Sequence, residues 1–217
     1  VLFLDEMPEF HKETLEALRQ PLEDGIVTIS RINASLTYPA RLMLVGALNP
    51  CPCGYYGDPV RECSCTPHQI QRYLARLSGP LLDRIDLHVE VPRLPYEDLS
   101  DQNRGESSAE IKKRVEYART VQRQRFQADN KRDTPKDFAK PHCNACMGPR
   151  EVREYCKPGK KARSLLKEAF GRLGLSARSH DRVLKVARTI ADLAGAELIE
   201  ETHIAEALQY RSPERKL

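Results

Sequence analysis

Two short apolar runs, each followed by polar residues, constrain the fold of this chain most strongly. Residues 1–4 and 42–47 are almost continuously hydrophobic over the length of a β-strand. Such runs, unlike alternating ones, predict strands that helices cover on both faces, as in a parallel sheet. Asp5 and Glu6 follow the first run, and Asn49 follows the second. The pattern therefore predicts an α/β fold with polar side chains at the strand ends, where a site can form.

The segment between the two runs predicts a helix and a β-hairpin. Residues 11–20 carry leucines at helical spacing, and we expect Pro21 to end this helix. Residues 23–31 and 35–38 are rich in strand-forming side chains, and the tip at residues 31–33 connects them. This arrangement is typical of two antiparallel strands joined by a turn.

The second half of the chain predicts helices. Residues 98–107 are polar and are interpreted as a linker, so we expect one domain over residues 1–100 and another over residues 101–217. Ser107 and Glu110 form a capping box before a helix that runs to about residue 127. Further helices are expected at residues 150–156, 160–173, 176–193 and 203–210.

Composition narrows the class of protein. The chain is 40% hydrophobic and 30% charged, with a net charge of +4, and no run approaches the roughly 20 apolar residues of a membrane span. The odd count of seven cysteines, four of them in two close C-x-C pairs, suits a reduced protein that uses thiolates for metal, so we expect a cytoplasmic protein. The chain opens inside an apolar run without an initiator methionine, and we interpret it as a fragment of a longer protein.

Four of the seven cysteines predict a structural zinc site. Cys51 and Cys53 are separated by nine residues from Cys63 and Cys65. Four thiolates suit tetrahedral Zn²⁺, although this spacing is tighter than the usual C-x₂-C. His68 is an alternative ligand, and four unligated thiols are the competing interpretation. We expect zinc within a cysteine loop at residues 50–66.

A second set of potential ligands follows in the other half of the chain. It consists of His142, Cys143, Cys146 and Cys156. Its spacing is looser, and Cys156 falls on an apolar helix face, so unligated cysteines are the favoured interpretation. We leave this set out of the predicted metal sites.

The strand-end residues have a specific use in nucleoside triphosphatases. Asp5 would hold Mg²⁺ directly or through its water, and Glu6 would orient and deprotonate the attacking water. Asn49 would hydrogen-bond a water or the γ-phosphate without repelling it. The competing interpretation is a strand end with solvated acids, since so short a pattern recurs by chance.

Arg84 also has two interpretations. It stands among acids immediately before an expected strand at residues 87–91. It would form a surface ion pair with Asp83 or Asp86, or act as an arginine finger that stabilises phosphoryl transfer in a neighbouring subunit.

In combination, these segments resemble the magnesium chelatase-like AAA+ family, especially its branch that acts in natural competence. The segments are residues 1–6, the hairpin from 24 to 31, residues 47–54 (ALNPCPCG), the Arg84 region, residues 175–178 (LSAR) and residues 186–193 (VARTIADL). The resemblance implies the C-terminal portion of an AAA+ P-loop core, with a parallel sheet and a pre-sensor β-hairpin, followed by an all-helical lid.

The resemblance also implies roles for individual residues. Asp5 and Glu6 match the Walker B acids, with Asp5 on Mg²⁺, and Asn49 matches sensor 1. Arg84 matches the arginine finger. Arg178 matches sensor 2, so Asp5, Asn49 and Arg178 would contact ATP.

The family resemblance implies partners as well. The hairpin would face DNA, with Arg31 as the phosphate contact at its tip and Asn33 as a weaker one. The expected protein is an ATP-driven motor, in a homo-oligomeric, hexameric ring, that acts on single-stranded or branched DNA in recombination. Alternatives are a magnesium chelatase-type ATPase subunit and a non-enzymatic, zinc-stabilised nucleic-acid-binding module.

One departure from the family pattern limits what these residues can do alone. The phosphate-binding sequence G-x-x-x-x-G-K-[ST] does not occur in the 217 residues. We expect this loop upstream in the complete protein. The 217 residues by themselves should bind ATP poorly and not hydrolyse it.

Overall fold

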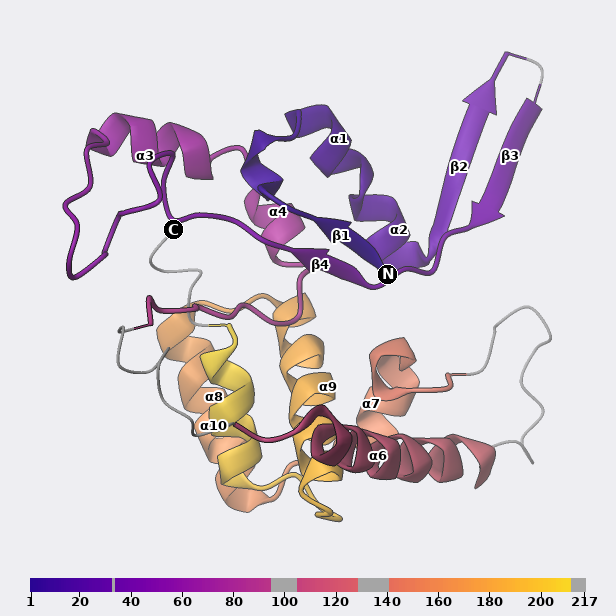
Figure 1. The fold of residues 1–217 in the computed structure, drawn as a ribbon. Helices are drawn as coiled ribbons and strands as arrows, with labels where there is room; N and C mark the ends of the chain where they lie inside the picture. Colours follow the sequence, from indigo (N-terminus) through magenta and orange to yellow (C-terminus); the bar gives the residue numbers. More distant parts are fainter. Residues whose placement is uncertain (33, 95–104, 129–140, 212–217) are drawn as a thin grey trace. The chain divides into compact units, whose positions relative to one another are not determined.

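The computed structural model describes residues 1–32, 34–94, 105–128 and 141–211 (Figure 1). The chain divides into two compact units. Unit 1 comprises Val1–Ile85, and unit 2 comprises Asp86–Ser212. The boundary predicted near residue 100 falls in the segment 95–104, which lies outside the described residues.

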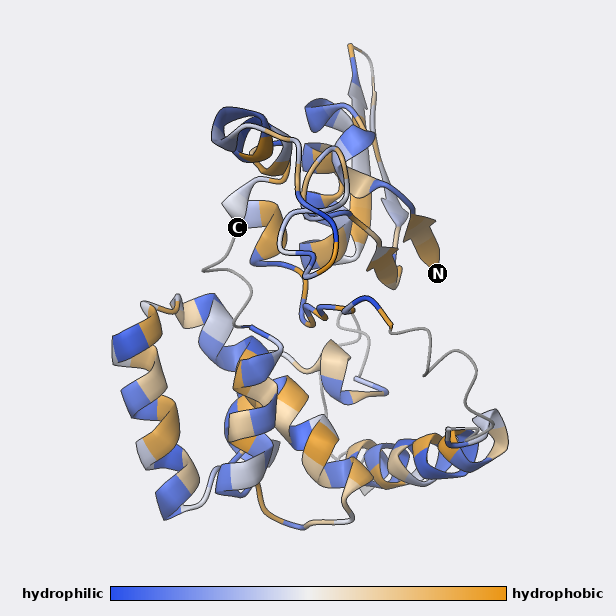
Figure 2. Cartoon of the chain, turned by 60° about the vertical axis from the view of Figure 1, so that its left-hand side comes forward, coloured by the Kyte–Doolittle hydropathy of each residue, from blue (hydrophilic) through white to orange (hydrophobic). Residues whose placement is uncertain are grey.

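Unit 1 contains the predicted pair of parallel strands. β1 (Leu2–Leu4) lies beside β4 (Leu44–Gly46), and the two are parallel, with Leu4 opposite Gly46. Figure 2 shows both strands as apolar. One face packs on the core through Leu4 and Leu44, whereas Phe3 and Val45 on the other face are 59% and 42% exposed. The expectation that both faces are covered is therefore wrong for the described residues.

The helices of unit 1 pack around a small leucine-rich core. They are η1 (Met7–Glu9), α1 (Lys12–Ala17), α2 (Arg19–Asp24), α3 (Pro67–Leu74) and α4 (Gly79–Leu82). Four buried side chains form the centre of the core: Met7, Leu15, Leu77 and Leu81.

Pro21 does not end a helix as predicted. The helix at residues 11–20 breaks at Leu18 instead, and Pro21 lies buried in the first turn of α2. A proline is tolerated in a first turn because the N–H groups there have no partner inside the helix.

The predicted β-hairpin is present. β2 (Ile26–Arg31) and β3 (Ala34–Pro39) are antiparallel, with Ile29 opposite Leu36. Gly25 ends α2 with a φ of 67°, a backbone conformation that glycine adopts without strain. Asn33, at the tip, lies outside the described residues.

The strand predicted at residues 87–91 is absent. The described segment from 86 to 94 has no regular secondary structure, and Val89 and Val91 are 67% and 84% exposed. The His88 N–H donates instead to the carbonyl of Tyr210 at 2.9 Å. A strand needs a neighbour for its backbone hydrogen bonds, and the described part of unit 2 offers only helices and an isolated bridge at Pro158 and Ile199.

Unit 2 is helical, as predicted. Its elements are α6 (Ser108–Ala128), η3 (Asn144–Cys146), α7 (Pro149–Tyr155), α8 (Lys160–Leu173), α9 (Ala177–Leu193) and α10 (Glu201–Gln209). The helix α9 is central, because it contacts α6, α7, α10 and η3. The Ser107–Glu110 capping box is formed, with the Glu110 N–H donating to Ser107 Oγ at 3.3 Å.

The helix α6 is buried only in its second half. Ala118 and Phe126 pack inside unit 2, and Gln122 between them is also buried. Ile111 and Val115 are 43% and 45% exposed. Each helix of the described residues is too short or too polar to cross a membrane.

Candidate functional site

The carboxyl ends of β1 and β4 bring the predicted nucleotide-site residues to one edge of the sheet. Backbone hydrogen bonds continue past the strands, from the Ala47 N–H to the Leu4 carbonyl and from the Met7 N–H to the Ala47 carbonyl, both at 2.9 Å. Asp5 and Glu6 thus leave β1 alongside the segment that leads from β4 to Asn49. All three side chains are exposed to solvent.

Glu6 has an unusual backbone conformation. Its φ of 49° and ψ of 44° make it the one non-glycine residue with positive φ among the described residues. That conformation costs roughly 1–2 kcal/mol for a residue with a side chain. The buried Met7 and Pro8 follow at once, and the Glu6 N–H donates to Asp5 Oδ1 at 3.0 Å. Strain at a surface carboxylate between a strand and a buried turn points to function rather than stability.

Tyr73, which sequence analysis did not single out, connects the two strand-end segments. It lies in α3 and is 6% exposed. Burial and the nearby Glu9 carboxylate raise the pKa of Tyr73, while a hydrogen bond from the Asn49 backbone lowers it and the Glu6 carboxylate raises it further. The Asn49 backbone and the Glu6 carboxylate therefore both influence the pKa of the Tyr73 hydroxyl. Tyr73 follows Ile70 at helical spacing in α3, and this apolar pattern was the available signal.

Arg84 is held within its own unit. Its Nη2 atom pairs with Glu23 Oε2 of α2 at 2.5 Å, and its Nη1 donates to the Pro80 carbonyl at 2.7 Å. The side chain is 10% exposed. Asp86, one of the two predicted partners, pairs with Arg182. The principal partner comes from a helix about 60 residues away, which no local pattern indicates.

Arg178 lies in the first turn of α9 in unit 2. The Ser179 N–H donates to Ser176 Oγ at 3.1 Å and caps this helix. The Arg178 residue is exposed. Its predicted role as sensor 2 stays a prediction.

The four cysteines predicted to bind zinc lie together. Their sulfur atoms are all within 4.8 Å of one another. Cys51 Sγ lies 3.3 Å from Cys53 Sγ and 3.6 Å from Cys63 Sγ, and Cys53 and Cys63 are 3.5 Å apart. Zinc–sulfur bonds of about 2.3 Å in a tetrahedron require sulfurs about 3.8 Å apart. The cluster therefore fits a zinc ion closely, and His68 is outside the set.

The loop that carries these cysteines is shaped by its own contacts. Gly54 and Gly57 have φ values of 83° and 82°, which favour glycine. Asp58 Oδ1 accepts the N–H groups of Val60 and Arg61 at 2.8 Å each. A backbone hydrogen bond from Tyr55 is the largest of the contacts that lower the pKa of Cys53, to about 5. Burial and the neighbouring sulfurs of Cys51 and Cys53 raise the pKa of Cys63 and of Cys65.

We expect zinc to stabilise this loop. Protein purified without chelator should lose one equivalent of zinc when Cys51 and Cys53 are both changed to serine, as measured by a colorimetric metal assay. Trypsin should then cleave after Arg61 faster, because the loop loses its central crosslink. The buried Cys156, outside the cluster, provides the control: Cys156→Ala should leave zinc content and the Arg61 cleavage rate unchanged. Equal zinc in parent and double variant would rule the site out.

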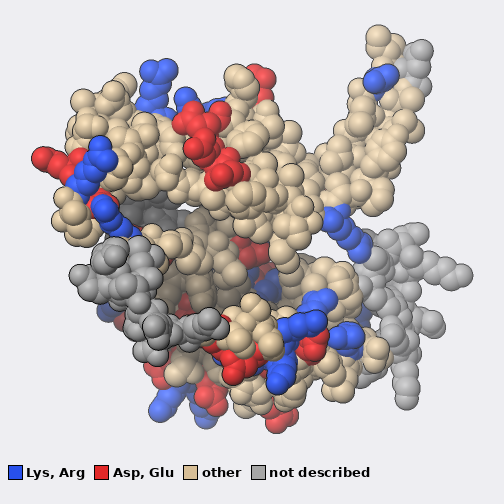
Figure 3. Space-filling model, viewed as in Figure 1, with Lys and Arg blue, Asp and Glu red and all other residues tan. Residues whose placement is uncertain are grey.

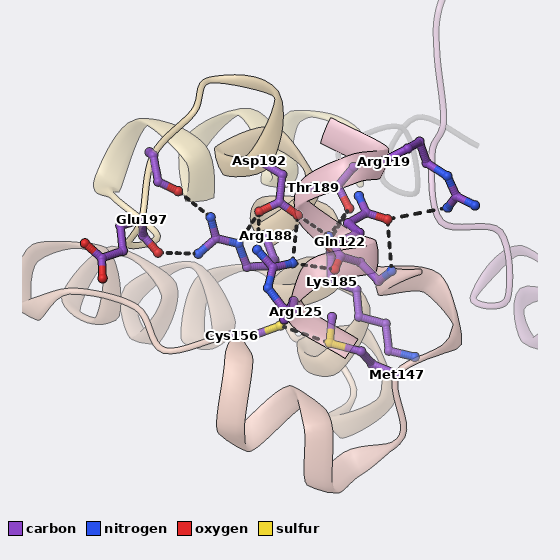
Figure 4. Close-up of polar contacts among 12 residues, drawn as sticks. Arg119, Gln122, Arg125, Met147, Cys156, Lys185, Arg188, Thr189, Asp192 and Glu197 are labelled. Atoms are coloured by element: carbon purple, nitrogen blue, oxygen red, sulfur yellow. Dashed lines mark hydrogen bonds and ion pairs between the residues drawn. The ribbon is translucent and has the colours of Figure 1, made fainter. Parts of the chain in front are cut away.

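A buried polar network in unit 2 was also missed by sequence analysis (Figure 4). Asp192, whose side chain is fully buried, accepts from Arg188 Nε at 3.0 Å and from Arg125 at 2.8 and 2.5 Å. Arg188 also donates to the carbonyls of Ala196 and Glu197. The i,i+4 spacing of Arg188 and Asp192 was the available signal. The network is part of the structural core of unit 2.

Comparison with known proteins agrees with this architecture. The family model for magnesium chelatase subunit ChlI matches residues 1–99, and the model for the C-terminal part of ChlI matches residues 105–211. The chain is 46% identical to competence protein ComM of Haemophilus influenzae and 46% identical to the uncharacterized protein YifB of Escherichia coli.

Both alignments cover 100% of this chain but 40% of each relative. An uncharacterized protein of Mycobacterium tuberculosis is 41% identical over 97% of the chain and 39% of its own length. The chain thus spans about two fifths of the length of these relatives. With two family models matching consecutive parts of it, the chain belongs to the magnesium chelatase-like family of AAA+ ATPases.

Proposed function

We propose that the complete protein is a DNA-dependent AAA+ motor that hydrolyses ATP at the carboxyl edge of the β1–β4 sheet. The observation that carries this proposal is the parallel pairing of these strands, which delivers Asp5, Glu6 and Asn49 to one edge. Membership of an ATPase family supports the reaction class.

The residues at this edge fit the groups that the reaction requires. Mg²⁺ prefers carboxylate oxygens and its own waters, and Asp5 offers a solvent-exposed carboxylate oriented by the Glu6 N–H. Bound Mg²⁺ would neutralise charge on the phosphates of ATP. Glu6 would accept a proton from the attacking water, and the Asn49 amide would orient that water or the γ-phosphate.

The proposal includes a ring of subunits, in which Arg84 acts on ATP bound by a neighbour. In the isolated chain the Arg84 guanidinium pairs with Glu23. Action in trans therefore requires the guanidinium to leave Glu23 for phosphate oxygens, which also bind guanidinium in a forked geometry.

The surface of the hairpin supports DNA as the partner. Arg31 is the one charged residue between positions 26 and 39, and Figure 3 shows a basic group near the tip of an otherwise uncharged hairpin. The face of the hairpin opposite to that of Arg31 carries four hydroxyl groups, paired across the strands at 3.2 Å: Thr28 with Thr37, and Ser30 with Ser35. Arginine and hydroxyl groups are typical ligands of nucleic-acid phosphates. The name of the Haemophilus influenzae relative, a competence protein, supports a role in transformation.

Changing Arg31 to alanine tests this assignment. In the complete protein, Arg31→Ala should weaken binding to single-stranded and branched DNA of any sequence, because a phosphate contact carries no base information. The slope of log affinity against log salt should decrease by about 1 for each lost contact. ATP hydrolysis without DNA should be unchanged. Fluorescence anisotropy over a salt series, together with a coupled ATPase assay, gives both readouts.

The matched control is Arg41→Ala, which removes an exposed arginine just beyond the hairpin. It should leave affinity and salt slope as they are in the parent. An Arg31→Ala protein with parental affinity and slope would contradict the DNA contact. Absence of any stimulation of ATPase by DNA in the parent would contradict the motor and favour a magnesium chelatase-type subunit.

A further inference from the structure

A second group of metal-ligating side chains lies in unit 2, away in sequence from the cysteine loop. The ligand atoms of His142, Cys143 and Cys146 all lie within 4.8 Å of one another. Cys143 Sγ is 3.4 Å from Cys146 Sγ, and Cys146 Sγ is 4.0 Å from His142 Nε2. In a tetrahedral zinc site, two sulfurs lie about 3.8 Å apart, and a sulfur and a nitrogen about 3.6 Å apart. These separations require only small side-chain adjustments around one ion.

The backbone between the two cysteines has the form of a metal-binding turn. Cys143 is extended, with φ −156° and ψ 165°, and precedes the single turn η3. The Cys146 N–H donates to the Cys143 carbonyl at 3.0 Å, which brings both side chains to the same side of the turn. The C-x₂-C spacing is the usual one for zinc.

This turn is fixed in place by contacts that need no metal. Asn144, between the cysteines, is 1% exposed. Its side chain donates to Asp192 at 2.8 Å and accepts from Arg125 at 2.9 Å, so Asn144 belongs to the buried network around Asp192. Lys185 Nζ donates to the Ala145 carbonyl at 3.3 Å. Because the turn is already anchored to α6 and α9, a metal would bind with little further ordering of the backbone.

The fourth residue of the set, Cys156, does not belong to this group. It is 3% exposed, and its sulfur lies 4.0 Å from the Met147 sulfur in the core of unit 2. His142 and Cys146, by contrast, are exposed, and Cys143 is partly exposed, so a metal can reach them.

We propose that His142, Cys143 and Cys146 bind a Zn²⁺ ion, with water or another donor in the fourth position. Two thiolates and one imidazole are ligands that zinc accepts in tetrahedral geometry. The ion would join His142 to the anchored turn η3. This site is independent of the ATPase proposal and of the cysteine loop.

Zinc content of the full chain tests the proposal. Parent protein should contain one more equivalent than the Cys143→Ser/Cys146→Ser variant. Cys156→Ala, the matched control in the same unit, should keep the parental content. The Cys51→Ser/Cys53→Ser variant should lose the zinc ion of the cysteine loop instead. The two variants therefore test the two zinc sites separately, and a negative result for one site does not change the result for the other.

Spectroscopy identifies the ligands of the second zinc site once the first site has been removed. In the Cys51→Ser/Cys53→Ser background, zinc-edge X-ray absorption should show two sulfurs at about 2.3 Å and a nitrogen at about 2.0 Å. His142→Ala, an exposed change that should not affect folding, should weaken zinc binding at least tenfold in a chelator competition. Equal zinc in parent and Cys143→Ser/Cys146→Ser protein would overturn the proposal, and so would a Cys143–Cys146 disulfide found by mass spectrometry in the purified protein.

Discussion

Asp192→Asn is expected to lower the free energy of unfolding of unit 2 by about 3–5 kcal/mol, the typical loss when one member of a buried ion pair is removed. The asparagine has nearly the same volume, so the loss is electrostatic. Arg125 and Arg188 would keep their charges without the carboxylate that both contact. Since a whole domain is stable by only about 5–15 kcal/mol, urea denaturation followed by circular dichroism should show the effect clearly.

Two further variants separate this explanation from a general sensitivity of α9. Asp181→Asn changes the same residue type in the same helix, but that side chain is 42% exposed, so the loss should be below about 0.5 kcal/mol. Adding Arg125→Met to Asp192→Asn should recover part of the stability, because it removes one unpaired buried charge. A loss from Asp192→Asn no greater than from Asp181→Asn would show that the network does not support unit 2.

Glu6→Gln in the complete protein should reduce ATP turnover by about 10²–10⁴-fold, the usual contribution of a positioned general base. The amide has the same shape and cannot accept the proton, and Mg²⁺ would still have Asp5. Affinity for ATP should therefore stay within a few-fold of the parent. Steady-state phosphate release and binding of a fluorescent ATP analogue measure the two quantities separately.

The control for this variant is Glu13→Gln, an exposed glutamate of α1, which should leave turnover unchanged. Glu6→Gly offers an independent check, because glycine adopts a φ of 49° without strain. It should be as inactive as Glu6→Gln and at least as stable as the parent. Turnover of Glu6→Gln within tenfold of the parent would remove Glu6 from the catalytic role.

Patterns of neighbouring residues predicted much of this fold, but not its long-range contacts. The apolar runs before Asp5 and Asn49 predicted two strands, and the structure pairs them in parallel. Helix periodicity gave α8 its observed bounds, from residue 160 to 173. The prediction that Pro21 ends a helix was wrong, because a proline in the first turn of a helix is tolerated and only one in the interior breaks it.

The candidate site shows the same division. Close spacing of Cys51, Cys53, Cys63 and Cys65 was enough to predict that they cluster. The partner of Arg84 was not predictable, because Glu23 is brought to it by packing of the core rather than by sequence proximity. The alternating residues 87–91 (LHVEV) do not form a strand, because pairing requires a second strand, which a local pattern cannot supply.

The pairing of Arg84 with Glu23 has a mechanical consequence. Glu23 lies near the end of α2, and the hairpin begins three residues later, at Ile26. If the Arg84 guanidinium moved to a nucleotide on an adjacent protomer, Glu23 would lose its positively charged partner. Glu23 lies at the base of the β2–β3 hairpin, which carries Arg31. Under the proposed function, ATP hydrolysis at one protomer boundary would therefore change the electrostatic environment at the base of the hairpin in the subunit that donates the arginine.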